Sequence, residues 1–168
     1  MTIRIVADST CDLPAEVIRA NNITIVPMYI NVGAEAYRDG IDLSRQEFYE
    51  RLPNFTHHPT TAAPSPGLFR QVYEQLAAEG ATEILSIHIS VKLSAVVDMA
   101  AQAAKETKAI PVTVLDSRQL SMGTGFQVLA AAQAAAAGRK MSEILAMLEE
   151  QITRTRTFAA LDTLEFLR

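Results

Sequence analysis

The sequence predicts an α/β protein, a three-layer α/β/α domain built on a mostly parallel sheet. Segments typical of strands and helices alternate along most of its 168 residues, and such alternation places helices on both faces of a parallel sheet. The length is that of one domain. With 49% apolar and 20% charged residues, the composition is that of an ordinary globular protein with a sizeable core.

Short extended and helical segments alternate in the first third of the chain. Runs of β-branched residues predict strands, and Gly33 predicts a hairpin. Ser44 and Glu47 form a capping box, which predicts a helix that ends near Arg51. The predicted strands cover residues 3–7, 23–26, 29–32 and 34–38, and a short helix covers residues 15–21.

Longer periodic segments follow. Apolar residues recur at helical spacing from Phe69 to Ala77, so a helix is predicted from Pro66 to Glu79, where Gly80 ends it. In an open parallel sheet, ligands bind outside the carboxyl ends of the strands, so the loops there are candidate sites. Further strands are predicted at 83–89, 112–115 and 157–161, and further helices at 94–107, 125–137 and 142–152.

Charge and composition exclude several classes of function. The net charge is −4 and no run of Lys and Arg exceeds two residues, so nucleic acid is not an expected partner. No apolar run reaches the roughly 18 residues of a membrane span. Cys11 is the single cysteine, which allows no internal disulfide and favours the cytoplasm. The histidines lack the spacing of metal ligands and no glycine-rich nucleotide motif occurs, so neither a metal nor a cofactor is expected.

The first hydroxyl-rich loop, residues 59–65, leads into the helix that starts at Pro66. Ser65 is a suitable N-cap, and proline is well placed at the first helical position. Free backbone N–H groups at this helix start, together with the hydroxyls of Thr60 and Thr61, would suit a carboxylate or a phosphate. The alternative interpretation is an ordinary helix start in which the threonines cap turns.

The second hydroxyl-rich loop, residues 86–94, continues a predicted strand. Ser86, His88 and Ser90 alternate onto one face of that strand. A buried parallel strand is normally apolar on both faces, so this polar face indicates a lined cavity, with Ser94 as N-cap of the next helix. The alternative is that Ser86 and His88 are hydrogen-bonded core groups.

A nucleophilic enzyme is the rival class of function. A hydrolase that uses Ser94 and His88 requires the two side chains to meet within about 3 Å. The chain has no Gly-x-Ser-x-Gly elbow, and Cys11 has no His or Lys beside it in sequence. The strand-end carboxylates Asp8 and Asp116 are expected to accept backbone N–H groups in Asx turns and so to fix the loops.

Four segments in order resemble the motifs of the DegV family of fatty-acid-binding proteins. Residues 5–14 resemble the family's opening Thr-Asp-Ser-Thr-x-Asp-Leu-Pro, and residues 59–66 its Thr-Ser-Gln-Pro-Ser-Pro signature. Residues 86–94 are similar to the family's Ile-Ser-Ser-x-Leu-Ser-Gly-Thr segment. Residues 114–125 are similar to its Asp-Ser and Ser-x-Gly-x-Gly stretch. The resemblance covers the whole chain and implies a fold like the DegV N-terminal domain.

The resemblance also implies a function. In that family a fatty acid lies between two α/β domains, and hydroxyls of the first domain hold its carboxylate. Carried over by motif, the ligand-binding residues are Thr61 and Ser94, followed by Ser90 and Thr60. The resemblance implies a carrier that is not an enzyme, and a partner fatty acid kinase that supplies ATP and magnesium.

Two departures from the family pattern qualify these expectations. Ala62–Ala63, Val91 and Ala95–Val96 replace residues with polar side chains or glycine, so the polar ring is thinner and a domain with a non-functional pocket is a further alternative. Residues 162–168 resemble the junction before the family's second domain. We therefore predict an N-terminal domain over residues 1–161 and the start of a connection over 162–168. An apolar wall left without its second domain would favour self-association.

Overall fold

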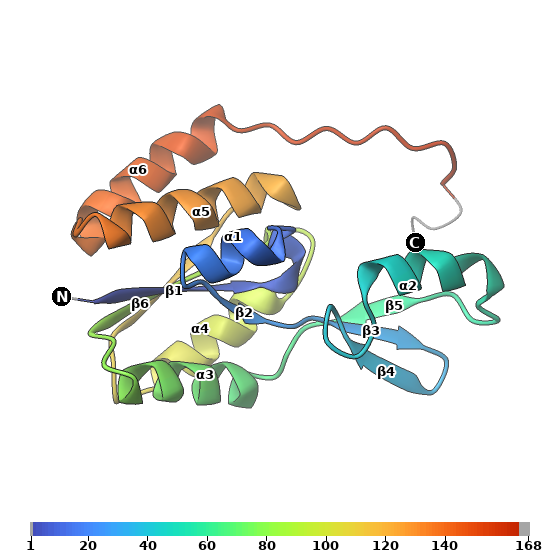
Figure 1. Ribbon diagram of the computed structural model, residues 1–168, viewed down its shortest axis with the longest axis horizontal. Helices are drawn as coiled ribbons and strands as arrows, with labels where there is room; N and C mark the ends of the chain where they lie inside the picture. Colours follow the sequence, from blue (N-terminus) through green and yellow to red (C-terminus); the bar gives the residue numbers. More distant parts are fainter. Residues whose placement is uncertain (1, 165–168) are drawn as a thin grey trace.

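A four-stranded parallel sheet forms the centre of the protein. The computed structural model describes residues 2–164, and the strand order is β2-β1-β6-β7 (Figure 1). The strands are β1 (Ile3–Asp8), β2 (Thr24–Val26), β6 (Glu83–His88) and β7 (Val112–Asp116). The predicted parallel sheet is confirmed.

Helices cover both faces of this sheet, which confirms the three-layer prediction (Figure 1). Side chains alternate along each strand, so Ile5 faces one helix layer while Val6 faces the other. The first layer holds α1 (Ala15–Ala20), α5 (Met122–Ala136) and α6 (Met141–Arg154), and the second holds α3 (Pro66–Ala78) and α4 (Val96–Glu106).

A smaller antiparallel sheet lies beyond the carboxyl end of the parallel one (Figure 1). Its order is β4-β3-β5, and the predicted hairpin of β3 (Tyr29–Val32) and β4 (Glu35–Arg38) is confirmed. Gly33 has a φ of +61°, a left-handed conformation that glycine adopts without strain. The predicted capping box opens α2 (Arg45–Arg51), and short 3₁₀ helices occupy η1 (Ser9–Cys11) and η2 (Leu52–Asn54).

One strand was not predicted. Residues 60–62, expected as loop, form β5 (Thr60–Ala62) and pair with β3, where Thr61 lies opposite Ile30. Three residues are too few for a periodic pattern to be recognised, so only the partner strand makes this segment a strand.

The strand predicted at 157–161 is wrong. No strand pairs with this segment among the described residues. The chain after α6 runs across the molecule towards α2 (Figure 1). Without a neighbour to pair with its backbone N–H and C=O groups, this segment gains nothing from strand geometry. Residues 162–164 have no regular structure, and the rest of the predicted connection lies outside the described residues.

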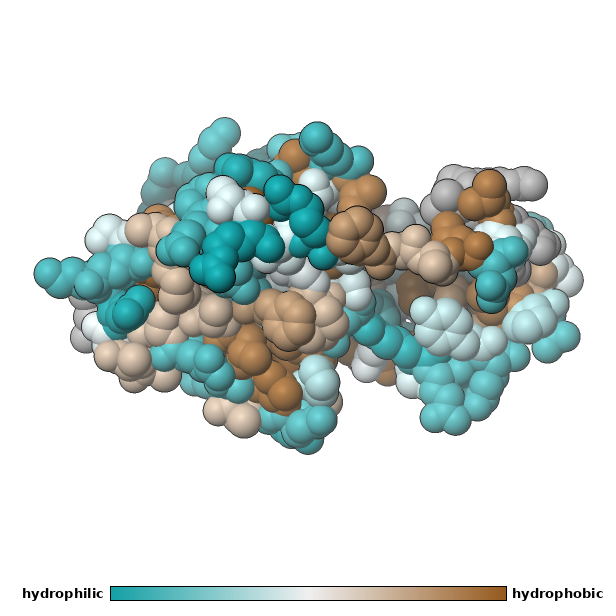
Figure 2. All heavy atoms as spheres, turned by 90° about the horizontal axis from the view of Figure 1, so that it is seen from above, coloured by the Kyte–Doolittle hydropathy of each residue, from teal (hydrophilic) through white to brown (hydrophobic). Residues whose placement is uncertain are grey.

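From above, the molecule narrows between the part that holds the parallel sheet and the smaller part (Figure 2). Within residues 2–164, no helix has both the length and the apolar character needed to cross a membrane.

Candidate functional site

A cavity of about 470 Å³ lies where the two sheets meet. Its volume is within the usual range of small-molecule sites. Loops after β1, β6 and β7 reach it from the carboxyl edge of the parallel sheet, while β3, β5 and α2 close it from the other side. This is the position predicted from the fold class. Apolar side chains form much of the wall: Met28, Ile30, Phe48, Tyr49, Ile89, Leu93 and Leu120.

The two hydroxyl-rich loops meet at this cavity. Thr60 and Thr61 reach it from β5, and Ser94 reaches it from the turn before α4. Ser90 is not among the lining residues. It is 7% exposed, and its hydroxyl oxygen accepts the Lys92 amide at 3.3 Å.

The hydroxyl protons at the cavity are free to donate. Neither Thr60 nor Thr61 has a side-chain hydrogen bond to any residue in the 2–164 range, and both are exposed. Ser94 Oγ accepts the Val96 amide at 3.3 Å, which leaves its proton unused. The prediction of Ser94 as the N-cap of α4 is wrong: α4 begins two residues later than expected, with Ala95 at the N-cap position. Consecutive residues of a strand point to opposite faces, and Thr61 lies opposite Ile30, which also lines the cavity. The O–H donors of Thr61 and Ser94 can therefore bind one oxyanion.

The charged groups of the cavity are already paired with one another. Arg45 forms an ion pair with Asp12, lies 3.9 Å from Asp39 and donates to the Ser9 carbonyl at 2.7 Å. Ser121 Oγ donates to the other oxygen of Asp12 at 2.5 Å. One cation therefore faces two carboxylates here, so an anionic ligand is better received at the hydroxyl side of the cavity.

A second cavity of about 540 Å³ adjoins the first and shares Asp12, Asp39 and Arg45 with it. None of the predicted ligand residues lines this second cavity. Within the 2–164 range, no group of three His, Cys, Asp or Glu side chains is placed to hold a metal ion.

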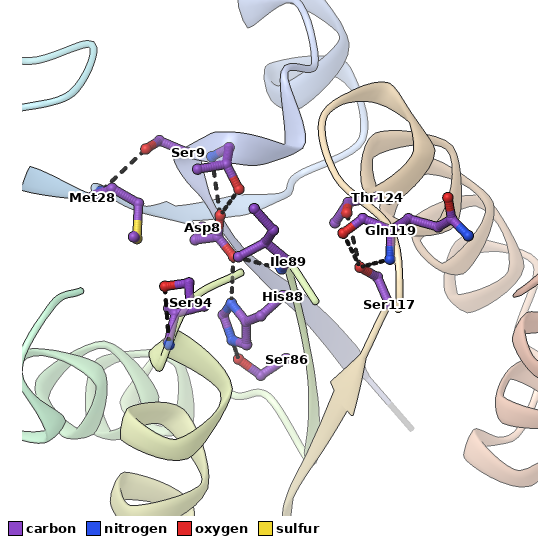
Figure 3. Close-up of polar contacts among 12 residues, drawn as sticks. Asp8, Ser9, Met28, Ser86, His88, Ile89, Ser94, Ser117, Gln119 and Thr124 are labelled. Carbon is purple, nitrogen blue, oxygen red and sulfur yellow. Dashed lines mark hydrogen bonds and ion pairs between the residues drawn. The ribbon is translucent and has the colours of Figure 1, made fainter. Parts of the chain in front are cut away.

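Ser86 and His88 belong to a buried hydrogen-bond network and do not line the cavity (Figure 3). Both are fully buried, which confirms the alternative interpretation of hydrogen-bonded core groups. His88 Nε2 lies 2.7 Å from Ser86 Oγ, and His88 Nδ1 lies 2.9 Å from Asp8 Oδ2. Tyr73 donates its hydroxyl to Ser86 at 2.9 Å, and burial raises the pKa of Tyr73 to about 12.

The rival Ser94–His88 pair is not formed. Both ring nitrogens of His88 are engaged elsewhere, and Ser94 is bonded to the backbone of Val96. Ser86, His88 and Asp8 have the contacts of a Ser-His-Asp triad, but each is 0% exposed, so no substrate reaches them. Burial raises the pKa of Cys11 to about 11, which keeps this thiol protonated near neutral pH and weakens it as a nucleophile.

The two strand-end aspartates form the predicted Asx turns. Asp8 accepts the Thr10 amide at 3.0 Å and Asp116 accepts the Arg118 amide at 2.9 Å. Burial acts to raise the pKa of Asp8, but hydrogen bonds from His88, Thr10 and the Ile89 amide outweigh it. The pKa of Asp8 is therefore lowered from its ordinary value of 3.8.

This shift predicts an acid-sensitive contribution to stability. A carboxyl with a lowered folded-state pKa stabilises the fold fully above its unfolded pKa, and this contribution is lost as pH falls through the folded-state pKa. The free energy of unfolding of the wild type should therefore exceed that of Asp8→Asn by a constant amount above about pH 5. The difference should shrink below about pH 4, as urea unfolding across pH would measure. A difference that stays constant down to pH 2 would contradict this assignment.

Sequence reasoning missed several residues of the site. Arg45, Phe48 and Tyr49 line the cavity from α2, and Leu120 and Ser121 line it from the loop before α5. Phe48 and Tyr49 are consecutive residues of the short helix predicted to end near Arg51. This aromatic pair was the available signal, because a short helix cannot pack two consecutive rings against the same neighbour.

The family model that matches this chain has the description "Uncharacterised protein, DegV family" and covers residues 2–168. A DegV domain-containing protein of Deinococcus radiodurans is 40% identical over the whole chain, which spans 59% of that protein. A DegV domain-containing protein of Streptomyces coelicolor is 36% identical over 99% of the chain, which spans 58% of its length. The chain therefore spans less than two thirds of these relatives.

Solved structures share the fold. A DegV family protein from Thermus thermophilus, described by its fatty acid binding, has a TM-score of 0.83 and 37% identity. DegV from Bacillus subtilis, described as a fatty acid binding protein, has a TM-score of 0.87 and 31% identity. Each alignment covers 91% of this chain and 54% of the other. The arrangement of the sheets, the order of the four motifs and these matches lead to one conclusion: this chain belongs to the DegV family.

Proposed function

We propose that this protein binds a long-chain fatty acid, with the carboxylate at the hydroxyls of Thr61, Ser94 and Thr60. The observation that carries this proposal is the meeting of the available hydroxyl donors of Thr61 and Ser94 with an apolar wall in one cavity. Hydroxyl donors suit a carboxylate, and each CH₂ group removed from water contributes about 0.8 kcal/mol. Ser90 is a weaker candidate, because its hydroxyl is buried and bonded to Lys92.

We further propose that the protein presents the bound acid to a separate fatty acid kinase and does no chemistry itself. The support for the partner is the family resemblance. The support for a carrier role is that Ser94 and His88 are not paired and that the Cys11 thiol stays protonated. The lone buried cysteine is compatible with the cytoplasm as its location.

Two related proposals concern the rest of the molecule. Residues 162–168 are proposed to begin the connection to a second domain, as the motif at the junction implies. Large apolar side chains are exposed near the cavity, with Tyr49 at 68% and Leu93 at 59%. We propose that this wall drives self-association of the chain when no fatty acid or partner covers it. Sedimentation velocity should then show dimers or larger species that palmitate dissociates.

Lipid extraction tests the binding proposal directly. Organic extraction of the purified protein, followed by mass spectrometry, is expected to yield a fatty acid in stoichiometric amount. The control is an unrelated protein of similar size, purified and extracted in the same way. If the protein yields no fatty acid above this control and takes up neither palmitate nor oleate, the proposal is wrong and a non-functional pocket becomes the better interpretation.

A further inference from the structure

The buried carboxylate of Asp8 joins two segments of the cavity wall. Asp8 ends β1 and is 0% exposed. Its Oδ1 accepts the amide and the hydroxyl of Thr10, and its Oδ2 accepts His88 Nδ1 and the Ile89 amide, the latter at 3.2 Å (Figure 3). Thr10 and Ile89 both line the cavity. The Asp8 side chain therefore accepts the backbone N–H groups of two residues that line the proposed site, Thr10 and Ile89.

A chain of buried hydrogen bonds ends at Asp8. An ionised carboxylate only accepts, so Nδ1 of His88 donates to it. Nε2 of the same ring is bonded to Ser86 Oγ, which accepts the Tyr73 hydroxyl. Phe69 packs edge-on against the His88 ring with centroids 5.2 Å apart, which fixes the ring's orientation.

The Ile89 amide is the fixed end of the segment that carries Ser94. The next amide, that of Ser90, donates to the Gln119 carbonyl at 3.0 Å. The Ser90 carbonyl then accepts the amides of Leu93 and Ser94 at 2.9 and 3.2 Å. Asp8 has no contact of its own with Ser94 among the bonds of the described residues, so any influence passes through this backbone.

We propose that Asp8 is a positioning residue of the site: its carboxylate holds Thr10 and the Ile89–Ser94 segment in the conformation that receives the ligand carboxylate. This inference rests on the proposed function. The proposal assigns the positioning role to Asp8 and not to the rest of the buried network. Tyr73 and Ser86 belong to the same chain of hydrogen bonds, but neither lines the cavity.

Asp8→Asn tests the proposal with little change in shape. Whichever oxygen is replaced by NH₂, the amide of Thr10 or that of Ile89 loses its acceptor. We expect faster hydrogen exchange at one of these amides and at Ser94, and at least about tenfold weaker binding of palmitate. Both are measured where the protein is fully folded, with sucrose in the buffer to favour the folded state.

Tyr73→Phe is the matched control, since it also removes one hydrogen bond of the buried network. It should lower stability while leaving exchange at Ile89 and Ser94, and the palmitate affinity, as in the wild type. The proposal is overturned if Asp8→Asn leaves the exchange rates unchanged, leaves the palmitate affinity unchanged, or resembles Tyr73→Phe in both. A wild type that binds no palmitate instead refutes the proposed function, while the exchange rates still decide whether Asp8 holds the segment.

His88 provides a second route if Asp8→Asn does not fold. His88→Asn keeps an N–H group near the place of Nδ1, whereas His88→Leu removes it. The asparagine variant is expected to retain most of the palmitate affinity, and the leucine variant to lose about tenfold. Equal affinities in the two variants would overturn the proposal.

Discussion

Replacing Thr61 and Ser94 together with alanine is expected to weaken palmitate binding about 100-fold. A hydrogen bond to a charged group contributes about 1.5–3 kcal/mol, and 1.4 kcal/mol corresponds to a factor of ten in Kd. Each single variant should therefore bind about tenfold more weakly. The 100-fold loss of the double variant is the sum of two independent free-energy losses, and a smaller loss would measure the coupling of the two hydroxyls through one carboxylate. Titration calorimetry with palmitate measures all three variants.

A matched control lies on α6, away from the cavity. The double variant Ser142→Ala/Thr153→Ala makes the same two chemical changes at exposed positions, so its palmitate affinity should equal that of the wild type. Unchanged affinity in Thr61→Ala/Ser94→Ala, with the control also unchanged, would place the head group elsewhere. Ser90→Ala adds a further comparison, because its hydroxyl caps the Lys92 amide and we expect its effect on affinity to be the smaller one.

Gly125→Ala is expected to destabilise the fold by about 2–3 kcal/mol, since overpacking of a tight contact has costs of this size. A Cβ at residue 125 would overlap the backbone carbonyl oxygen of Cys11 and lie 3.3 Å from the Leu13 side chain. A backbone carbonyl cannot adopt another rotamer as a flexible side chain can. The clash would therefore be relieved only if α5 moved away from η1. Thermal unfolding should show a Tm lower by about 4–12 °C.

Gly67→Ala is the control for this substitution. Gly67 also lies in a helix, but its Cβ would have only Ser65 Oγ nearby, at 3.7 Å. Alanine favours helix over glycine by up to about 1 kcal/mol, so this variant should be as stable as the wild type or slightly more stable. If Gly125→Ala were equally well tolerated, the close contact between α5 and η1 would not be what requires glycine at residue 125.

The contact at Gly125 also bears on the site. The segment around η1 carries Thr10 and Asp12, both of which line the cavity. Its position on the sheet is therefore set partly by a glycine whose role is packing. In sequence Gly125 is the last glycine of the segment that resembles Ser-x-Gly-x-Gly, and the motif does not explain why glycine is needed there. The structure does, because a side chain at residue 125 would overlap the Cys11 carbonyl oxygen.

The sequence by itself determined the fold class, most of the elements and the edge of the sheet where the proposed site lies. These features depend on local patterns: strand and helix periodicity, the capping box at Ser44, and the rule that parallel strands end at one edge. The two hydroxyl-rich loops could be selected from sequence for the same reason, since each adjoins a predicted helix start.

Only the tertiary structure decided which polar residues face the cavity. Ser86, His88 and Ser90 share one face of a strand in sequence, yet Ser86 and His88 are bonded within the core and Ser90 caps a turn. Asp8 and His88 are 80 residues apart, and β5 is a strand only because β3 pairs with it. Whether a polar side chain faces the cavity, or a short segment forms a strand, depends on hydrogen-bond partners that are distant in sequence. The local pattern of one segment carries no information about where those partners lie.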